Sequence, residues 1–181
     1  LTPKYMSDVV MSAPLHDVGK IKVPERVINK PGKLTAEEYE MMKVHPLAGF
    51  RIISGMSWDK KISLGARFHH ERYDGKGYPD GREGENIPEI GRIIAVADAY
   101  DAMTSNRSYR DALPQAEVRQ QIEDGKGKQF DPVMADIMLE VIDKDKEYKL
   151  RQHAKRNYRI LVVDDDNISV MRVRKVTEKI K

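Results

Sequence analysis

The chain has 181 residues, no cysteine and a formal net charge of +3. This length suffices for one full domain and a fragment of a second, and the lack of cysteine leaves histidine and carboxylate as metal ligands. No apolar run predicts a membrane span and no signal sequence opens the chain, so we expect a cytoplasmic protein that binds no membrane.

The helices predicted for the first part of the chain are short. Apolar periodicity indicates one over residues 4–17, which ends on an adjacent His-Asp pair. Thr35 followed by Glu38 is a capping-box pattern and predicts the start of a helix that runs toward His45. Two further helices are expected over residues 47–53 and 62–68.

A glycine-rich stretch and a long apolar helix follow. Residues 73–88 contain four glycines and two prolines, and a loop of this length is usually functional or disordered. The segment 90–103 is apolar nearly all round, which predicts a buried helix. Asp98 lies in the middle of this segment, where a carboxylate must be paired or must bind a cation.

Two more helices are predicted to complete the body of the chain. Pro114 begins the first, which Gly125 ends, and Asp131 caps the second. We expect four apolar residues on the inner face of the last helix, namely Val133, Ile137, Met138 and Val141.

The composition changes after residue 143. Residues 144–159 hold seven basic and two acidic side chains. No aromatic residues interleave them in a nucleic-acid-binding pattern, so we interpret 144–157 as a solvated basic linker. An apolar, β-branched run of buried-strand type then precedes three aspartates and an amphipathic piece, which predicts a β-α fragment over 158–181.

Six histidine and aspartate side chains carry the predicted chemistry. Any one of the histidines alone is better explained by a hydrogen bond, but the set indicates a metal site. Imidazole and carboxylate without thiolate suit iron, manganese, zinc or nickel. Adjacent side chains on a helix diverge by about 100°, so we expect Asp17 to bridge two cations. The candidate ligands are His16, Asp17, His45, His69, His70 and Asp98.

Two cations that share a carboxylate are the usual apparatus for hydrolysing a phosphate ester. Lys20, one turn beyond Asp17, is placed to bind a phosphoryl oxygen or is simply an exposed helix end. Arg107 and Arg110 lie three residues apart, and they either clamp a phosphate or pair with neighbouring aspartates.

Five motifs in this order resemble the HD-GYP family, a branch of the HD metal phosphohydrolases. The resemblance covers residues 1–143 and implies an all-α fold, the helical bundle of the HD superfamily. The motifs are His16-Asp17-Val18-Gly19-Lys20, Lys43-Val44-His45-Pro46, His69-His70-Glu71, Asp74-Gly75-Lys76-Gly77-Tyr78-Pro79-Asp80-Gly81 and Ala97-Asp98-Ala99-Tyr100-Asp101-Ala102-Met103-Thr104-Ser105.

The resemblance also implies a metal-dependent phosphodiesterase in bacterial two-component signalling, which opens cyclic di-GMP to pGpG and leaves open whether pGpG or GMP is the final product. Two divalent metal ions are implied, with iron or manganese preferred to zinc or nickel. The implied ligands of the first ion are His16, Asp17 and Asp98. Asp17 would bridge to a second ion, held by His45, His69 and His70.

Asp17 and Lys20 are the catalytic residues that the resemblance implies. The implied substrate-binding residues are Lys20, Arg107, Arg110 and Tyr78. Tyr78 belongs to the Gly-Tyr-Pro loop that names the family. This loop serves substrate access or contact with a partner such as a diguanylate-cyclase (GGDEF) domain, or else Tyr78 is a loop anchor.

The chain departs from the family pattern at two places. Family members carry a further histidine upstream of the His-Asp pair, whereas no histidine precedes His16 here. Because the chain begins at Leu1, we expect an excised segment. Three explanations of the missing histidine stay open: its helix was cut away, another chain supplies it, or the first metal site is weak. Asn106 and Ser108 replace the family's Asp and Pro, which we expect to loosen that loop.

Two other functions therefore stay open at this stage. One is a nucleotide-binding or partner-binding module that has lost turnover because its metal site is incomplete. The other is an HD hydrolase of a different nucleotide, although those branches lack the Gly77-Tyr78-Pro79 loop.

Residues 158–181 resemble the first β-α unit of a response-regulator receiver domain, whose acidic pair binds magnesium. The phosphoacceptor of a receiver would lie beyond Lys181, so we expect a sensor kinase as partner only for a complete receiver. The alternative is a β-α addition that docks elsewhere.

Overall fold

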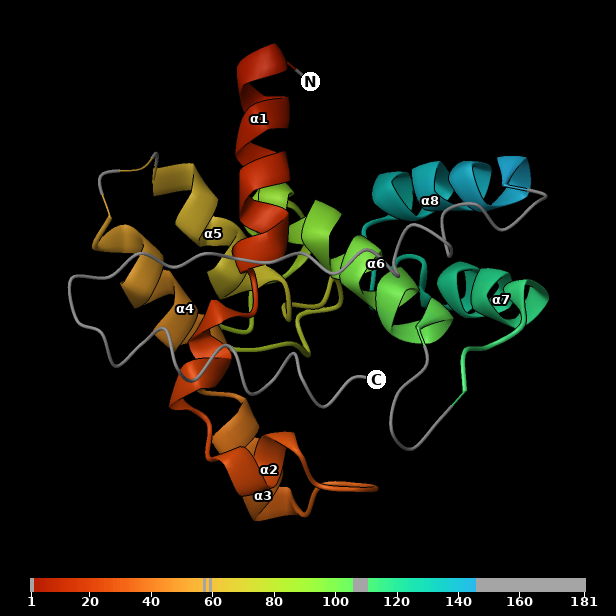
Figure 1. Ribbon diagram of the computed structural model, residues 1–181. Coiled ribbons are helices and arrows are strands. Elements are labelled where there is room, and N and C mark those ends of the chain that lie inside the picture. The colour runs from red at the N-terminus through yellow and green to blue at the C-terminus, as the bar shows by residue number, and fades with distance from the viewer. Residues whose placement is uncertain (1, 57, 59, 106–110, 146–181) are drawn as a thin grey trace.

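The computed structural model describes residues 2–56, 58, 60–105 and 111–145, and regular structure in these ranges is helical, with two isolated β-bridges and no strand. The predicted all-α fold is thus confirmed (Figure 1). The predicted fragment over 158–181, and the linker beyond Asp145, lie outside the described residues. The α-helices are α1 (Pro3–Ser12), α2 (Glu25–Ile28), α3 (Ala36–Met42), α4 (His45–Ser54), α5 (Lys60–Phe68), α6 (Glu89–Thr104), α7 (Gln115–Gly125) and α8 (Pro132–Lys144). The short 3-10 helices are η1 (Ala13–Leu15), η2 (Val18–Lys22) and η3 (Gly84–Asn86).

Two helix starts follow directly from predicted capping residues. The Thr35 hydroxyl accepts a hydrogen bond from the Glu38 amide at 3.3 Å, and the Glu38 carboxylate accepts one from the Thr35 amide at 2.7 Å. The capping box at the start of α3 is therefore confirmed. Asp131 caps α8 by accepting hydrogen bonds from the amides of Val133 and Met134.

The predicted helix over 4–17 is too long. Helix α1 ends at Ser12 and η1 continues the chain only to Leu15. Pro14 explains the change, because proline cannot donate to the helical ladder and crowds the preceding turn. At Asp17 the backbone turns, with φ −99° and ψ 4°, before η2 begins. The His-Asp pair therefore lies at a break between helical segments.

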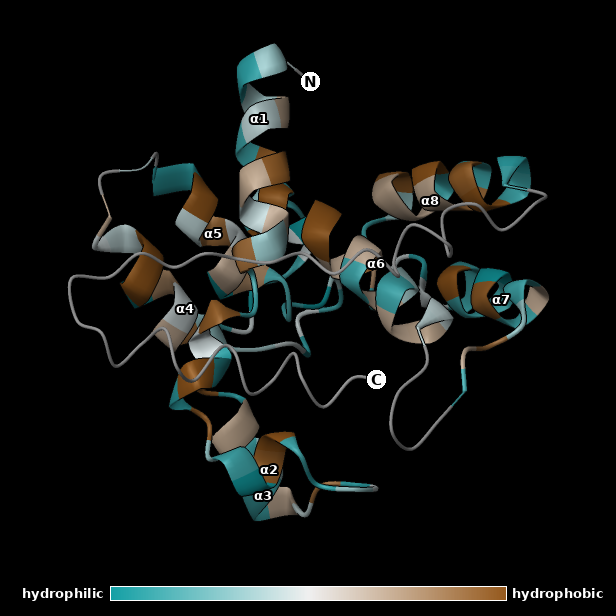
Figure 2. Cartoon of the chain, viewed as in Figure 1, coloured by the Kyte–Doolittle hydropathy of each residue, from teal (hydrophilic) through white to brown (hydrophobic). Residues whose placement is uncertain are grey.

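Helix α6 separates two groups of helices (Figure 1). Helices α4 and α5 pack together and α5 packs on α6, whereas α7 and α8 pack together on the other part of α6. Apolar residues occur on α6, α7 and α8, as Figure 2 shows. The larger buried cluster joins these helices and comprises Val96, Met103, Val118, Ile122, Phe130, Ala135, Leu139 and Ile142.

A smaller buried cluster holds the turn that carries Asp17. It consists of Ile53 from α4 with Ile62 and Ala66 from α5, and Leu15 and Val18 pack against it. These last two residues flank the His-Asp pair on both sides. The pair is therefore fixed relative to α4 and α5 by apolar packing.

Gly19 lets η2 approach α4 more closely than any other residue would. A Cβ atom at Gly19 would lie 1.9 Å from the carbonyl oxygen of His45 and 2.4 Å from the amide nitrogen of Gly49. No side chain fits at these distances. The glycine of the first motif therefore sets the distance between the Asp17 turn and the start of α4.

The predicted inner face of α8 is wrong in large part. Met138 packs against the larger cluster as expected, but Leu139 and Ile142 fill that cluster instead of the other predicted residues. Helix α8 carries apolar residues on two faces, so periodicity alone did not distinguish them. The three predicted residues that are exposed, at 62%, 52% and 38%, are Val133, Ile137 and Val141.

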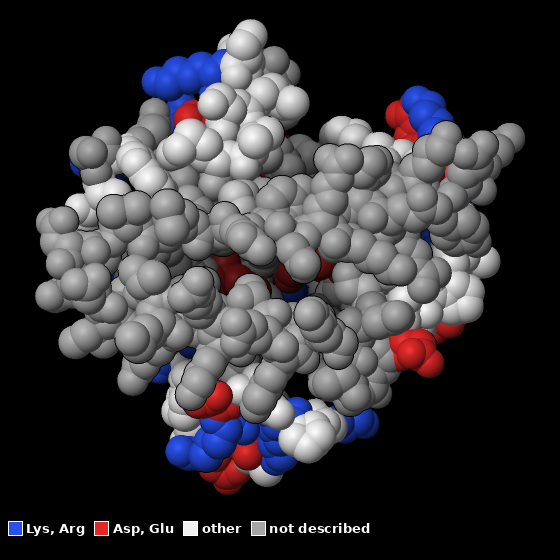
Figure 3. Space-filling model, in the orientation of Figure 1, with Lys and Arg blue, Asp and Glu red and all other residues white. Residues whose placement is uncertain are grey.

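Charged side chains of both signs gather over α2 and α3, at the lower end of the view in Figure 3. Lys30 pairs there with Glu38 at 2.5 Å, and Lys43 pairs with Glu40 at 2.6 Å. This mixture of charges is typical of a solvated face. Among the described residues, no helix has the length and apolar character needed to cross a membrane.

We predict that Gly19→Ala destabilises the domain, because its methyl group would overlap the backbone of α4. The expected loss is about 1–3 kcal/mol or more of unfolding free energy, measured by urea denaturation. Gly55→Ala is the matched control, since its Cβ would meet only ordinary contacts of 3.5 Å or longer. Equal stability of the two variants would contradict the close packing of η2 on α4.

A second prediction tests which face of α8 is buried. Ile142 is 2% exposed and Ile137 is 52% exposed on the same helix. Ile142→Ala should cost about 2–5 kcal/mol of unfolding free energy. Ile137→Ala should change it by less than about 0.5 kcal/mol. If Ile137→Ala lost more unfolding free energy than Ile142→Ala, the buried face of α8 would be the one predicted from the sequence.

Candidate metal centre

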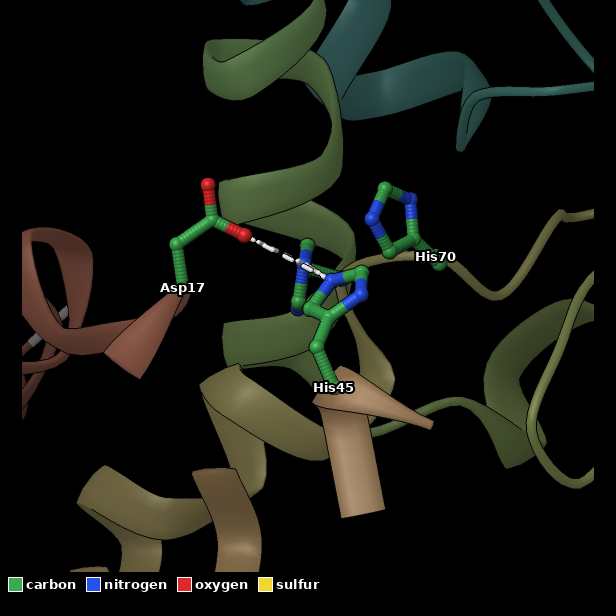
Figure 4. A group of neighbouring side chains, drawn as sticks. Asp17, His45 and His70 are labelled. Carbon is green, nitrogen blue, oxygen red and sulfur yellow. Dashed lines mark hydrogen bonds and ion pairs between the residues drawn. The ribbon is translucent and has the colours of Figure 1, made fainter. Parts of the chain in front are cut away.

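Four of the predicted ligands meet at one point although they come from three segments. Asp17 lies at the turn before η2, His45 begins α4, and His69 and His70 directly follow α5. One ligand atom from each of the four lies within 4.8 Å of the others. Figure 4 shows the Asp17 carboxylate pointing toward the His45 ring, with His70 beyond it. The described residues thus contain a candidate metal-binding cluster.

Backbone carbonyls orient the imidazole rings. His45 donates from Nδ1 to the carbonyl of Met42 at 2.7 Å, and His69 donates from Nδ1 to the carbonyl of Ala66 at 2.9 Å. His16 makes the same kind of bond at 2.6 Å to a carbonyl three residues upstream. A ring held in this way turns Nε2 toward a metal, as is usual for histidine ligands.

The Nε2 atoms converge with the aspartate. Nε2 of His45 lies 3.3 Å from Nε2 of His69, and Oδ1 of Asp17 lies 3.4 Å and 3.8 Å from these two atoms. Because each Nδ1 carries the proton in the neutral ring, both Nε2 atoms present lone pairs. Lone pairs and a carboxylate that face one another repel unless a cation lies between them. The donor set therefore fits a divalent metal ion.

Burial keeps these histidines in the form that binds metal. It lowers the pKa of His45, and burial together with the neighbouring His70 lowers the pKa of His69 well below its ordinary value. Burial, aided by His45, lowers the pKa of His70 to about 4. All three rings are therefore neutral at pH 7, and neutral imidazole is the ligand.

His16 and Asp98 lie on the other side of the Asp17 carboxylate. Nε2 of His16 is 3.4 Å from Oδ2 of Asp17 and 3.5 Å from Oδ1 of Asp98, and it makes no well-aligned hydrogen bond with the described residues. Burial lowers the pKa of His16, but the two carboxylates outweigh burial and raise this pKa to about 10. A divalent cation between these groups would replace that proton.

Each oxygen of Asp17 therefore faces a different group of ligands. Oδ1 faces His45 and His69, and Oδ2 faces His16. Burial raises the pKa of Asp17, but His16 and Lys20 hold it below its ordinary range, so the carboxylate is ionised. This is the arrangement that a bridging carboxylate requires.

Lys20 and Asp98 both border a cavity. The Lys20 ammonium donates to Oδ2 of Asp17, and the Lys20 side chain is 40% exposed. The Asp98 side chain is 30% exposed, so the helix expected to be buried opens to solvent at this point. Arg107 and Arg110 lie outside the described residues.

The cavity has a volume of about 550 Å³ and extends well beyond the ligand cluster. Its lining includes the ligand candidates Asp17 and Asp98 and, outside the ligand cluster, Lys76, Gln121 and Gln129. Sequence reasoning did not identify these last three as site residues. The glutamines lie in α7 and in the turn that follows it, and they carry no motif signal that could have found them.

Tyr78 covers the ligand cluster from the Gly-Tyr-Pro loop. Its ring stacks on His70 with centroids 4.8 Å apart and planes at 21°, and the Tyr39 ring contacts it edge-on at 6.2 Å. Lys43 places its ammonium over both tyrosine rings. Burial and Tyr39 raise the pKa of the Tyr78 hydroxyl. Tyr39 was missed because its helical spacing resembled that of a core residue.

The fold and the site together define a small helical domain with a histidine and carboxylate cluster beside a cavity. The family described as "HD domain" matches residues 1–134. The chain therefore belongs to the HD domain family.

Several relatives have named activities. The chain is 44% identical over 140 residues to a cyclic di-GMP phosphodiesterase of Thermotoga maritima, covering 76% of the chain and 38% of the relative. It is 47% identical over 142 residues to the cyclic di-GMP phosphodiesterase response regulator RpfG of Xanthomonas campestris, covering 77% and 37%. It is 39% identical over 140 residues to the 3'3'-cGAMP-specific phosphodiesterase 2 of Vibrio cholerae, covering 74% and 26%.

These three relatives are much longer than the chain, which spans 26% to 38% of their length. A solved structure of a cyclic GMP-AMP specific phosphodiesterase from V. cholerae shares the fold. The TM-score is 0.62 at 18% identity, covering 91% of this chain and 47% of that one.

We predict that His69→Ala abolishes tight metal binding, because it removes an Nε2 atom at the centre of the cluster. Metal per chain would be measured by plasma mass spectrometry after loading with Mn²⁺ and desalting. Tyr78→Phe is the control, since it keeps the ring that stacks on His70 and should retain the metal. Unchanged metal content in His69→Ala would exclude His69 as a ligand.

Proposed function

We propose that this chain is the catalytic domain of a cytoplasmic, metal-dependent phosphodiesterase that hydrolyses cyclic di-GMP to pGpG, with GMP as the alternative final product. The observation that carries the proposal is the carboxylate of Asp17, which offers one oxygen to each of two ligand groups beside a cavity. The names of the relatives from T. maritima and X. campestris support this substrate.

We assign two divalent ions to the site. The proposed ligands of the first are His16, Asp17 and Asp98. The proposed ligands of the second are Asp17, His45, His69 and His70. Iron or manganese is preferred to zinc or nickel on the family resemblance, since the ligand types suit all four. Such ions supply Lewis acidity, which activates water and offsets charge on phosphoryl oxygens.

The side chains of the protein bind and orient the substrate. Lys20 already borders the cavity beside Asp17, and it would donate to a non-bridging phosphate oxygen. Tyr78 would contact the ligand over His70. We assign Arg107 and Arg110 to contacts further along the substrate on the basis of the sequence motif alone.

A second candidate substrate is 3'3'-cGAMP, in which adenine replaces one guanine. The specific observation in its favour is the 39% identity to the V. cholerae enzyme named for that substrate. The two substrates share the phosphodiester that the proposed metal site would attack. Comparison of kcat/KM for both nucleotides decides between them.

The proposed partners extend beyond the substrate. The exposed residues 80–83, which follow Pro79, would contact a diguanylate-cyclase (GGDEF) domain. The fragment over 158–181 would belong to a receiver domain, which a sensor kinase would phosphorylate only in its complete form. One relative is itself named a response regulator.

We predict that the Mn²⁺-loaded chain hydrolyses cyclic di-GMP and that Asp17→Ala reduces both metal content and turnover to background. The reason is that Asp17 faces both ligand groups. Chromatography of pGpG and GMP measures the reaction. Asp136→Ala is the control, because this residue pairs with Lys126 on the surface of α8. Full metal content in Asp17→Ala would rule out a bridging role.

We also predict that Lys20→Ala lowers kcat by about 10²–10³-fold, as expected when one donor to a reacting oxyanion is removed. Its metal content should stay near that of the unmodified chain, because Lys20 is not among the clustered ligands. If the loaded chain binds cyclic di-GMP but releases no product, a binding module without turnover is the correct function.

A further inference from the structure

Glu71 directly follows the two histidines of the cluster, yet both of its oxygens are used elsewhere. Its side chain borders the cavity and the residue is only 3% exposed. Oε1 accepts a hydrogen bond from the amide of Asp80 at 2.7 Å, and Oε2 accepts one from the amide of Arg82 at 3.0 Å. One buried carboxylate thus holds the far end of the Gly-Tyr-Pro loop.

The first residues of the same loop motif, Gly77 and Tyr78, pack closely against residues 70–72. The amide of Tyr78 donates to the carbonyl of His70 at 3.2 Å. A Cβ atom at Gly77 would lie 2.3 Å from the amide nitrogen of Arg72 and 2.5 Å from Cα of Glu71. The loop therefore doubles back over the residues that follow α5, with Glu71 at the centre of the fold-back.

This fold-back brings the Tyr78 ring to its place. The amide of Tyr78 is itself bound to His70, and the two amides bound by Glu71 follow two and four residues later in the loop. Its ring can stack on His70 only while the loop keeps this path. The position of the Tyr78 ring therefore depends on Glu71, because the Glu71 carboxylate binds the loop backbone at Asp80 and Arg82.

A second tether on the loop offers a comparison. Arg67 donates to both oxygens of Asp80, at 3.0 Å from Nη2 and 3.3 Å from Nε, and the two side chains are 27% and 23% exposed. A partly exposed pair of this kind is screened by solvent and contributes little. The hydrogen bonds to Glu71 are part-buried and charge-assisted, and they end on a residue that is only 3% exposed, so their loss leaves this buried side chain without its partners.

We propose that Glu71 is a positioning residue, which holds the Gly-Tyr-Pro loop so that Tyr78 lies over the metal centre and contacts the substrate. It is neither a metal ligand nor a proton-transfer group. The role in catalysis rests on the proposed phosphodiesterase function, whereas the hold on the loop does not.

The variant Glu71→Gln tests the proposal with little change of shape. The amide keeps one acceptor oxygen but turns an NH₂ group toward a backbone N–H of the loop, so one of the two bonds becomes a donor-donor contact. Arg67→Gln is the matched control, because it removes the partly exposed tether on the same Asp80.

The first experiment measures amide hydrogen exchange and needs no activity. In the Mn²⁺-loaded chain, we expect the amides of Asp80 and Arg82 to exchange at least about tenfold faster in Glu71→Gln than in the unmodified chain or in Arg67→Gln. Metal per chain should be equal in all three. Unchanged exchange, or loss of metal in Glu71→Gln, would overturn the proposal.

The second experiment is a double-mutant cycle with Tyr78→Ala on hydrolysis of cyclic di-GMP. We expect Glu71→Gln to reduce kcat/KM by about 10-fold to 100-fold, as for residues that orient functional groups. The double variant should then be no worse than Tyr78→Ala alone, because Glu71 acts through Tyr78. Additive losses would refute that coupling.

Absence of turnover in the unmodified chain would refute the phosphodiesterase function. The hydrogen-exchange result would still show whether Glu71 holds the loop.

Discussion

The convergence of lone pairs on the Asp17 carboxylate is the constraint on which the rest of the structure depends. Two imidazole Nε2 atoms 3.3 Å apart and a carboxylate repel one another in the absence of a cation. Other interactions must therefore hold these side chains in place in the metal-free protein. Backbone carbonyls fix the rings of His45 and His69, and Leu15 and Val18 pack the Asp17 turn against the smaller core. The apolar packing therefore preorganises a polar site that is unfavourable by itself.

Residues 69–71, which supply two of the candidate histidine ligands, also position the side chains around the cluster. His70 receives the Tyr78 ring on one face, and the adjacent Glu71 holds the loop from which that ring comes. Donors and acceptors that would be costly if buried alone are thus paired across a long irregular loop. Protein partners of its backbone groups hold this long connection in place.

Local signals explain which elements could be predicted. The capping box of Thr35 and Glu38 and the cap at Asp131 depend on neighbours two or three residues away, and both were predicted correctly. The end of α1 and the buried face of α8 were not. The prediction for the first helix followed the apolar pattern of residues 4–17, whereas in the structure Pro14 lies just beyond the end of the α-helix. Helix α8 has two apolar faces, of which only one meets α6 and α7. A choice of face is a tertiary property, and periodicity does not contain it.

By itself, the sequence determined the all-helical class, the order of the motifs and the identity of the residues that meet at the cluster. Those properties depend on residue type and spacing, which the chain carries locally. Only the tertiary structure decided that the two oxygens of Asp17 face different ligand groups, that Tyr39 packs against Tyr78, and that Glu71 binds the loop. The physical reason is that each of these contacts depends on the direction of a side chain after distant segments have packed, and a direction is fixed only by that packing.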